Sequence, residues 1–113
     1  LNGYFLIAQT VVNQLNSGTK GDTLYEVLTY KNNYSVYSSG RYKKFTPSDN
    51  AKEAVRLALS NTLPPNFAQL QIAESDLYKI TAFCTVSHLS KYPSGTHGRM
   101  TKVVQYQNVW FFK

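Results

Sequence analysis

Cysteine is nearly absent from this sequence of 113 residues, in which Cys84 stands alone. A single thiol excludes an internal disulfide, and with His88 and His97 it falls short of the four ligands of a structural zinc site. No stretch approaches the roughly 20 consecutive apolar residues that a transmembrane helix needs. We therefore expect no metal, no cofactor and no membrane span.

Acidic residues are also scarce, and their distribution is uneven. The six acids all lie between Asp22 and Asp76, the net charge is +6, and residues 77–113 contain cations but no carboxylate. Such a charge distribution attracts polyanions. Nucleic acid, an anionic membrane surface and the teichoic acids of a bacterial wall all fit this description.

The common catalytic motifs are missing. Neither GxGxxG nor GxxxxGK[ST] nor GxSxG occurs. Cys84 and His88 would lie about 13 Å apart along an extended strand, which is too far for a nucleophilic dyad. Residues 93–99 (PSGTHGR) could bind an anion, although a plain surface loop is the simpler interpretation.

The acids offer two closely spaced pairs. Asp49 and Glu53 are one helical turn apart beside cations, which is typical of a solvated helix face. Glu74 and Asp76 are one residue apart, and we interpret them as capping or turn residues. The alternative is a glycosidase-like pair, whose carboxyl groups lie about 5–10 Å apart.

Aromatic residues, in contrast, are abundant, with nine tyrosines and six phenylalanines. Residues 32–45 (NNYSVYSSGRYKKF) combine four rings and three cations with no acid. Rings beside cations stack on bases, but a tyrosine face can equally lie on a sugar while amides and hydroxyls bind its OH groups. Because no RNA-binding motif or helix-turn-helix is present, saccharide is favoured over nucleic acid. The predicted binding residues are Asn33, Tyr34, Ser35, Tyr37, Ser39, Arg41 and Tyr42.

The apolar spacing predicts an α+β domain in which three helices precede a small antiparallel sheet. The first helix covers 3–18 and ends at Gly18. The second covers 23–30, capped by Asp22, with Leu24, Val27 and Leu28 pointing inward. The third runs from an N-cap at Thr46 to about residue 61, burying alanines together with Val55 and Leu59. Strands are expected within 77–89 and 102–113, and an irregular segment with a turn at 38–40 within the tyrosine-rich stretch.

The ordered segments LNGYFLIAQTVVNQL, DTLYEVLTY, NNYSVYSSGRYKKFTPSDNAKEAVRLALSN, LPPNF and QNVWFF resemble the SleB/CwlJ-type cell-wall hydrolase family, which includes spore-cortex-lytic enzymes and phage lysins. The family pattern is matched in the three helices, at the turn and near the end of the chain. The matching residues are Gly3, Asn13, Val27, Leu28, Tyr34, Ser35, Ser39, Gly40, Arg41, Ala51, Ala54, Ala58, Asn108, Phe111 and Phe112.

This resemblance implies one lysozyme-like, lytic-transglycosylase-like domain over residues 1–113, located outside the cell or at the cell wall. Its substrate would be the peptidoglycan glycan strand, cleaved between N-acetylmuramic acid and N-acetylglucosamine by one glutamic acid. In the family that glutamate lies just before the glycine matched by Gly3, so we expect it on an upstream segment, and the catalytic residue is unknown in this chain. Val109 replaces the family's terminal histidine. The alternative is therefore a catalytically degenerate module that binds glycan or builds a phage or cell envelope.

Overall fold

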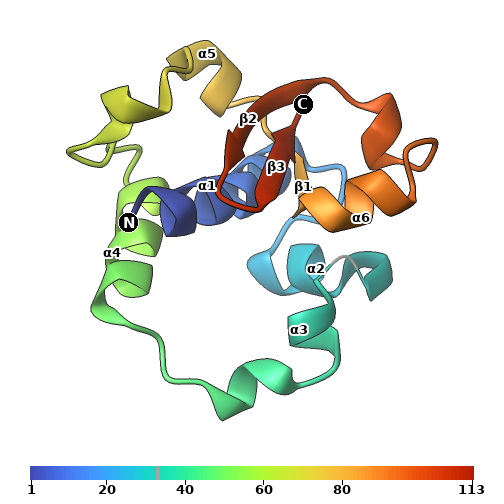
Figure 1. The fold of residues 1–113 in the computed structure, drawn as a ribbon. Helices are drawn as coiled ribbons and strands as arrows, with labels where there is room; N and C mark the ends of the chain where they lie inside the picture. Colours follow the sequence, from blue (N-terminus) through green and yellow to red (C-terminus); the bar gives the residue numbers. More distant parts are fainter. Residues whose placement is uncertain (33) are drawn as a thin grey trace.

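The longest helix, α1 (Asn2–Ser17), runs through the middle of the fold, as the computed structural model of residues 1–32 and 34–113 shows (Figure 1). Its Phe5 and Leu6 are buried in the core. Gly18 ends the helix in the left-handed conformation (φ 71°), where the absence of a Cβ removes the steric cost. The predicted first helix and its end at Gly18 are therefore confirmed.

The helix α4 (Asp49–Leu59) packs directly against α1 through small residues. Ala54 and Ala58 are fully buried, which lets the two helices approach closely. The hydroxyl of Ser48 accepts a hydrogen bond from the Ala51 amide at 3.1 Å, so Ser48 is the N-cap and the prediction of Thr46 was wrong.

The outer face of α4 departs from the predicted burial. Val55 is 49% exposed and Leu59 is 63% exposed, although the helical spacing predicted both to be buried. Helical periodicity identifies an apolar face, but it does not say whether a neighbouring element covers that face.

The short helix α2 (Leu24–Thr29) follows a tight turn. Its N-cap is Thr23, whose hydroxyl accepts from the Glu26 amide at 3.2 Å and donates to the Glu26 carboxylate at 3.1 Å. The predicted cap at Asp22 was therefore wrong by one residue. Val27 is buried as predicted, whereas Leu24 is 49% exposed, contrary to the prediction.

The second half of the chain contains more helical turns than the sequence predicts. In chain order the elements are a 3-10 turn (Phe67–Leu70), α5 (Glu74–Leu77), β1 (Ala82–Thr85), α6 (Val86–Lys91), a 3-10 turn (His97–Arg99), β2 (Lys102–Tyr106) and β3 (Val109–Phe112).

Of the first predicted strand, 77–89, only β1 is a strand, and the rest of the prediction was wrong. After β1, the Thr85 hydroxyl accepts a hydrogen bond from the His88 amide at 3.1 Å and caps α6. The second, 102–113, is a hairpin that turns at residues 107 and 108.

The three strands form one antiparallel sheet with β3 in the centre, in the order β1-β3-β2. Phe111 of β3 lies opposite Phe83 of β1 and Val104 of β2. A Cβ on Gly3 would lie 2.8 Å from the Tyr106 ring, so glycine at this position lets the hairpin lie against α1. The predicted α+β class is confirmed.

The described part of the chain contains no helix that is both long enough and apolar enough to cross a membrane.

Candidate functional site

The tyrosine-rich segment folds into two short helical pieces joined by a turn. These are α3 (Ser35–Ser38) and a 3-10 turn (Arg41–Lys44), where the sequence predicted irregular backbone with a turn at 38–40. Gly40 has φ 76° at the junction, and its amide donates to the Tyr37 carbonyl at 3.1 Å. The reversal at Gly40 folds the second piece back on the first, so side chains from both reach the same surface.

Arg41 ties the two pieces together. Its guanidinium donates to the Ser35 hydroxyl and to the Ser39 hydroxyl, both at 3.1 Å. These bonds use two of the five N–H groups of the side chain, and Arg41 forms no ion pair among the described residues. Arg41 is exposed, and its other N–H groups are of the kind that bind oxygen atoms of a ligand.

Three tyrosine rings gather beside this arginine, and we call Tyr25, Tyr37 and Tyr42 the ring cluster. The Tyr37 and Tyr42 rings stack with centroids 4.9 Å apart and an interplanar angle of 9°. Tyr25 of α2 meets Tyr37 edge-on at 6.4 Å. Tyr25 and Tyr42 remain 66% and 42% exposed, so the cluster presents aromatic area to solvent.

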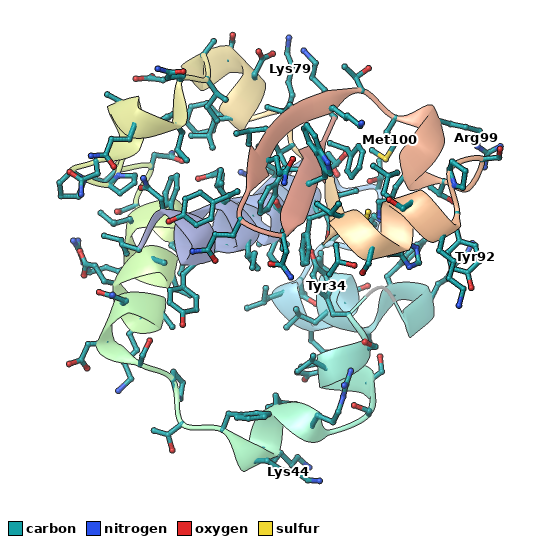
Figure 2. The ribbon with its side chains drawn as sticks, in the orientation of Figure 1. Tyr34, Lys44, Lys79, Tyr92, Arg99 and Met100 are labelled. Atoms are coloured by element: carbon teal, nitrogen blue, oxygen red, sulfur yellow. The ribbon has the colours of Figure 1, made fainter. Side chains whose placement is uncertain are left out.

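Tyr34 points away from the ring cluster and toward α1. Figure 2 shows it near the centre of the molecule, whereas Lys44 lies at the outer edge. Its hydroxyl donates to the Gln14 side-chain carbonyl at 2.8 Å, and its ring lies 6.1 Å from that of Phe83. Burial raises the pKa of Tyr34 to about 12.

Gln14 belongs to a series of buried amides on α1. Its Nε2 donates to the Thr81 carbonyl at 2.6 Å. Asn13 donates to the carbonyls of Leu77 and Ile80 at 2.9 and 2.8 Å. These bonds attach the segment that enters β1 to α1, which places Phe83 opposite Tyr34.

A small recess opens between these elements. It has a volume of about 110 Å³, and its walls are Gln14, Tyr34, Ala82, Phe83 and His97. A hydroxyl, an amide and an imidazole therefore converge on one aromatic wall. Pockets that hold a whole small molecule occupy about 300–1,000 Å³, so this recess suits one substituent of a larger ligand.

Among the described residues that line this recess, His97 alone carries an imidazole. Its ring packs 5.4 Å from that of Phe112 and 5.8 Å from that of His88. Partial burial lowers the pKa of His97, and the charge on His88 lowers it further. The lowered pKa favours the neutral imidazole, which can both accept and donate a hydrogen bond. The described residues contain no group of three or more His, Cys, Asp or Glu side chains arranged to hold a metal ion.

Within the described chain no carboxylate lines the recess. Glu53 pairs with Arg56 and Asp76 with Lys113 at 2.7 Å, and in each pair the hydrogen bond from the cation lowers the pKa of the carboxyl group. A general acid needs the opposite shift.

Cys84, for which the sequence already excluded a nucleophilic dyad with His88, is no better placed for chemistry. Burial raises the pKa of the Cys84 thiol, which keeps it protonated and unreactive at neutral pH. The arrangement as described can bind a ligand through rings, hydroxyls and amides.

The structure therefore separates the predicted site residues into two adjoining groups. One group consists of Tyr37 and Tyr42, which belong to the ring cluster, together with Arg41 and the two serines that it binds, Ser35 and Ser39. Tyr34 lines the recess, and because it directly precedes Ser35 the two groups adjoin. Asn33 lies outside the described residues.

The sequence-based prediction missed four contributors, namely Tyr25, Gln14, Phe83 and His97. Tyr25 is one of the abundant tyrosines, and the same reasoning from composition could have added it to the predicted binding residues. The other three lie 20 to 63 residues from Tyr34 in sequence, and only the packing of α1 against β1 brings them there.

Comparisons with protein families, curated proteins and solved structures find no match to this chain.

Proposed function

We propose that this protein binds the glycan strands of peptidoglycan through the ring cluster and the adjoining recess. The observation that carries the proposal is the juxtaposition of exposed tyrosine rings with Arg41 and two serine hydroxyls. Aromatic faces pack on the C–H faces of pyranose rings, while guanidinium and hydroxyl groups bind sugar oxygens.

The recess matches a second feature of such a ligand, its N-acetyl groups. Wall glycans carry an N-acetyl group on each sugar, and this group combines a small apolar methyl with an amide. Phe83 and Ala82 offer apolar contact, while the Tyr34 hydroxyl oxygen and the His97 imidazole offer polar partners within the same small volume. We propose that the recess accepts this substituent when the sugar backbone lies on the ring cluster.

Cleavage of the glycan is a second candidate, supported by the ordered resemblance to cell-wall hydrolases. It requires a carboxyl group of raised pKa at the scissile bond, and no described residue of the site supplies one. Binding is therefore the function that the geometry supports best. Release of reducing or anhydro ends from purified peptidoglycan distinguishes cleavage from binding.

The test of binding is a titration of the chain with a soluble GlcNAc–MurNAc tetrasaccharide, followed by calorimetry. Tyr42→Ala removes half of the stacked pair, so we expect about 5–10-fold weaker binding, the low end of the effect that one lost aromatic stacking contact produces. Tyr34→Phe, which removes only a hydroxyl from the recess, should weaken binding by a smaller factor.

Tyr78→Ala is the matched control, because Tyr78 is 41% exposed, close to the 42% of Tyr42, and belongs neither to the ring cluster nor to the recess. Its affinity should equal that of the unmodified chain. Equal losses in Tyr42→Ala and Tyr78→Ala, or no binding of the tetrasaccharide at all, would refute the proposal.

A further inference from the structure

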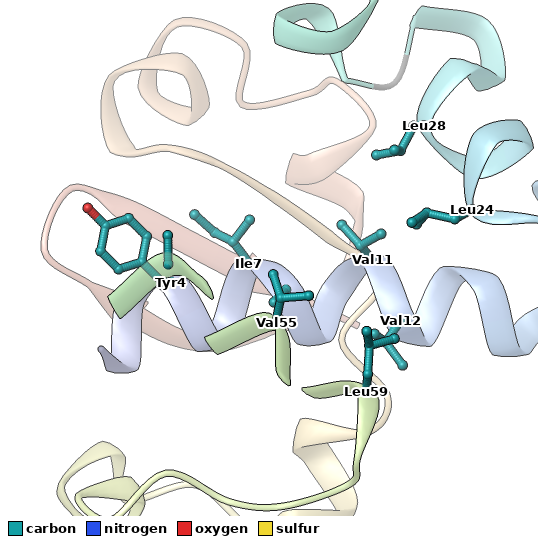
Figure 3. A pocket seen from close by; sticks show the side chains of 10 residues that line it. Tyr4, Ile7, Val11, Val12, Leu24, Leu28, Val55 and Leu59 are labelled. Carbon is teal, nitrogen blue, oxygen red and sulfur yellow. The ribbon is translucent and has the colours of Figure 1, made fainter. Parts of the chain in front are cut away.

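One side of α1 is buried in the core, and a continuous apolar stripe adjoins it, in which Ala8 and Val12 are partly buried against the core. The stripe consists of Tyr4, Ile7, Ala8, Val11 and Val12. These positions follow the i, i+3, i+4, i+7, i+8 spacing of one helix face and cover about 12 Å along the axis. Figure 3 shows Tyr4, Ile7 and Val11 in a row along α1.

Two further helices flank this stripe and turn it into a groove. Leu24 and Leu28 come from α2, and Ala51, Val55 and Leu59 come from α4 (Figure 3). The groove has a volume of about 350 Å³, and among the described residues no charged side chain lines it. The wall residues Leu24, Val55 and Leu59 are each about half exposed or more. Clustered exposed apolar side chains of this kind mark interaction sites.

The charge along the α4 edge of the groove is positive. On α4, Lys52 and Arg56 each follow a groove residue by one position, which is a rotation of about 100° and places them along the outer edge. Glu53 lies farther around the helix and is engaged by Arg56. The whole molecule carries a net charge of +6. An acidic occupant is therefore attracted, whereas a second copy of this chain is repelled.

The shape of the groove also restricts the occupant. Its floor is one helix and its walls are two others, so an additional helix would complete a four-helix arrangement with apolar residues interdigitating at the centre. A flat bilayer surface cannot reach a floor that lies between two helical walls.

We propose that this groove binds an amphipathic α-helix of a partner protein. That helix carries apolar residues at i, i+3, i+4 and i+7 and acidic residues on the flanks of this stripe. The proposal is independent of glycan binding, because none of the groove residues belongs to the ring cluster or the recess.

The test uses a fluorescent 18-residue peptide with leucine at the stripe positions and glutamate on both flanks, titrated with the full 113-residue chain and followed by anisotropy. A second peptide keeps the stripe and replaces each glutamate with lysine. We expect the acidic peptide to bind at least about tenfold more tightly than the basic one at low ionic strength.

Val55→Glu places a charge on the wall of the groove, and we expect it to weaken binding of the acidic peptide at least about tenfold. Val36→Glu is the matched control, because Val36 is 48% exposed against 49% for Val55 and does not line the groove. Both variants change the net charge equally, so only a contact at the groove distinguishes them. Circular dichroism checks that both remain folded.

Several outcomes would overturn the proposal. One is equal binding of the two peptides, and another is an equal effect of the two variants. A third is self-association of the unmodified chain in the ultracentrifuge that Val55→Glu abolishes, which would assign the groove to a second copy. The last is binding of laurate or of phosphatidylglycerol vesicles that depends on Val55 when the acidic peptide does not bind.

Discussion

Buried amides on α1 determine where the candidate site lies. Gln9, Asn13 and Gln14 are buried on a helix that reads as apolar in sequence, and Gln9 donates to the Asn13 side chain at 2.9 Å. Buried amides are costly unless their hydrogen bonds are formed, and here Asn13 and Gln14 bind carbonyls of the segment that enters β1. Gln14 then accepts from Tyr34, so one helix positions both sides of the recess.

The Tyr34 hydroxyl should have a measurable, pH-dependent effect on stability. Because the pKa of Tyr34 is raised from 10.0 to about 12 in the folded state, the folded chain retains a proton that the unfolded chain releases. Stability from this group is therefore present below pH 10 and is lost as the pH rises toward 12.

At pH 8 we expect Tyr34→Phe to lower the free energy of unfolding by about 1 kcal/mol, because Gln14 loses a donor. By pH 11 this difference should shrink or reverse, since phenylalanine cannot ionise. Urea unfolding of both proteins at each pH measures the effect, with Tyr78→Phe as the exposed control. A difference that does not change with pH would contradict this account of Tyr34.

His97 offers a second titration in the same recess. Its pKa lies below 6.5 because burial disfavours the charged form and the charge on His88 adds to this. We expect His88→Asn to raise the pKa of His97 while leaving it below 6.5, since burial is the larger cause. The imidazole Cε1–H shift in an NMR titration measures this pKa directly.

Because the pKa of His97 is lowered in the folded state, the free energy of unfolding should fall as the pH drops below about 6.5. An unchanged pKa in His88→Asn would show that the two rings do not interact electrostatically.

Helix caps decide where the elements begin, and α4 allows a direct test. Two hydroxyl residues precede it, but only Ser48 accepts a hydrogen bond from the first turn. We expect Ser48→Ala to lower the free energy of unfolding by about 1 kcal/mol and Thr46→Ala to change it little. Chemical denaturation of the two variants measures the difference. A larger loss of stability in Thr46→Ala than in Ser48→Ala would show instead that Thr46 is the cap.

At the scale of elements, periodicity predicted α1, α2 and α4 and the presence of a small sheet. It failed where local hydrogen bonds override β-propensity, as at Thr85, which begins α6 within a β-rich stretch. It failed again at residues 107 and 108, where Gln107 adopts φ 54° and reverses the chain without the glycine that usually marks such a turn.

The candidate site was predictable only in part, for a related reason. Tyr37, Arg41 and Tyr42 are close in sequence, and local turns suffice to bring them together. His97 and Phe83 reach Tyr34 only through the packing of β1 on α1, which depends on buried amides rather than on an apolar pattern. Helical periodicity also predicted Val55 and Leu59 as core residues, because it cannot distinguish a face covered by the same chain from one left to a partner.

The two attractions that we propose for the molecule as a whole, to an anionic wall and to a sugar, should respond differently to salt. The net charge of +6 acts over distances limited by the Debye length, about 8 Å at physiological ionic strength. Contacts of the ring cluster and the recess with a neutral sugar depend on packing and hydrogen bonds at short range. Attachment to an anionic wall should therefore respond to salt, while binding of the sugar itself should not.

We expect retention on wall fragments that carry teichoic acid to fall about tenfold or more between 50 and 500 mM NaCl. Over the same range the dissociation constant for a neutral N-acetylglucosamine tetrasaccharide should change by less than about twofold, because no counterions are released. Fragments stripped of teichoic acid should resemble the neutral sugar. A steep loss of affinity for the neutral sugar would contradict stacking on the ring cluster. Tight, salt-sensitive binding of single-stranded DNA with no binding of the sugar would instead show that the tyrosines and cations of residues 34–44 recognise nucleic acid.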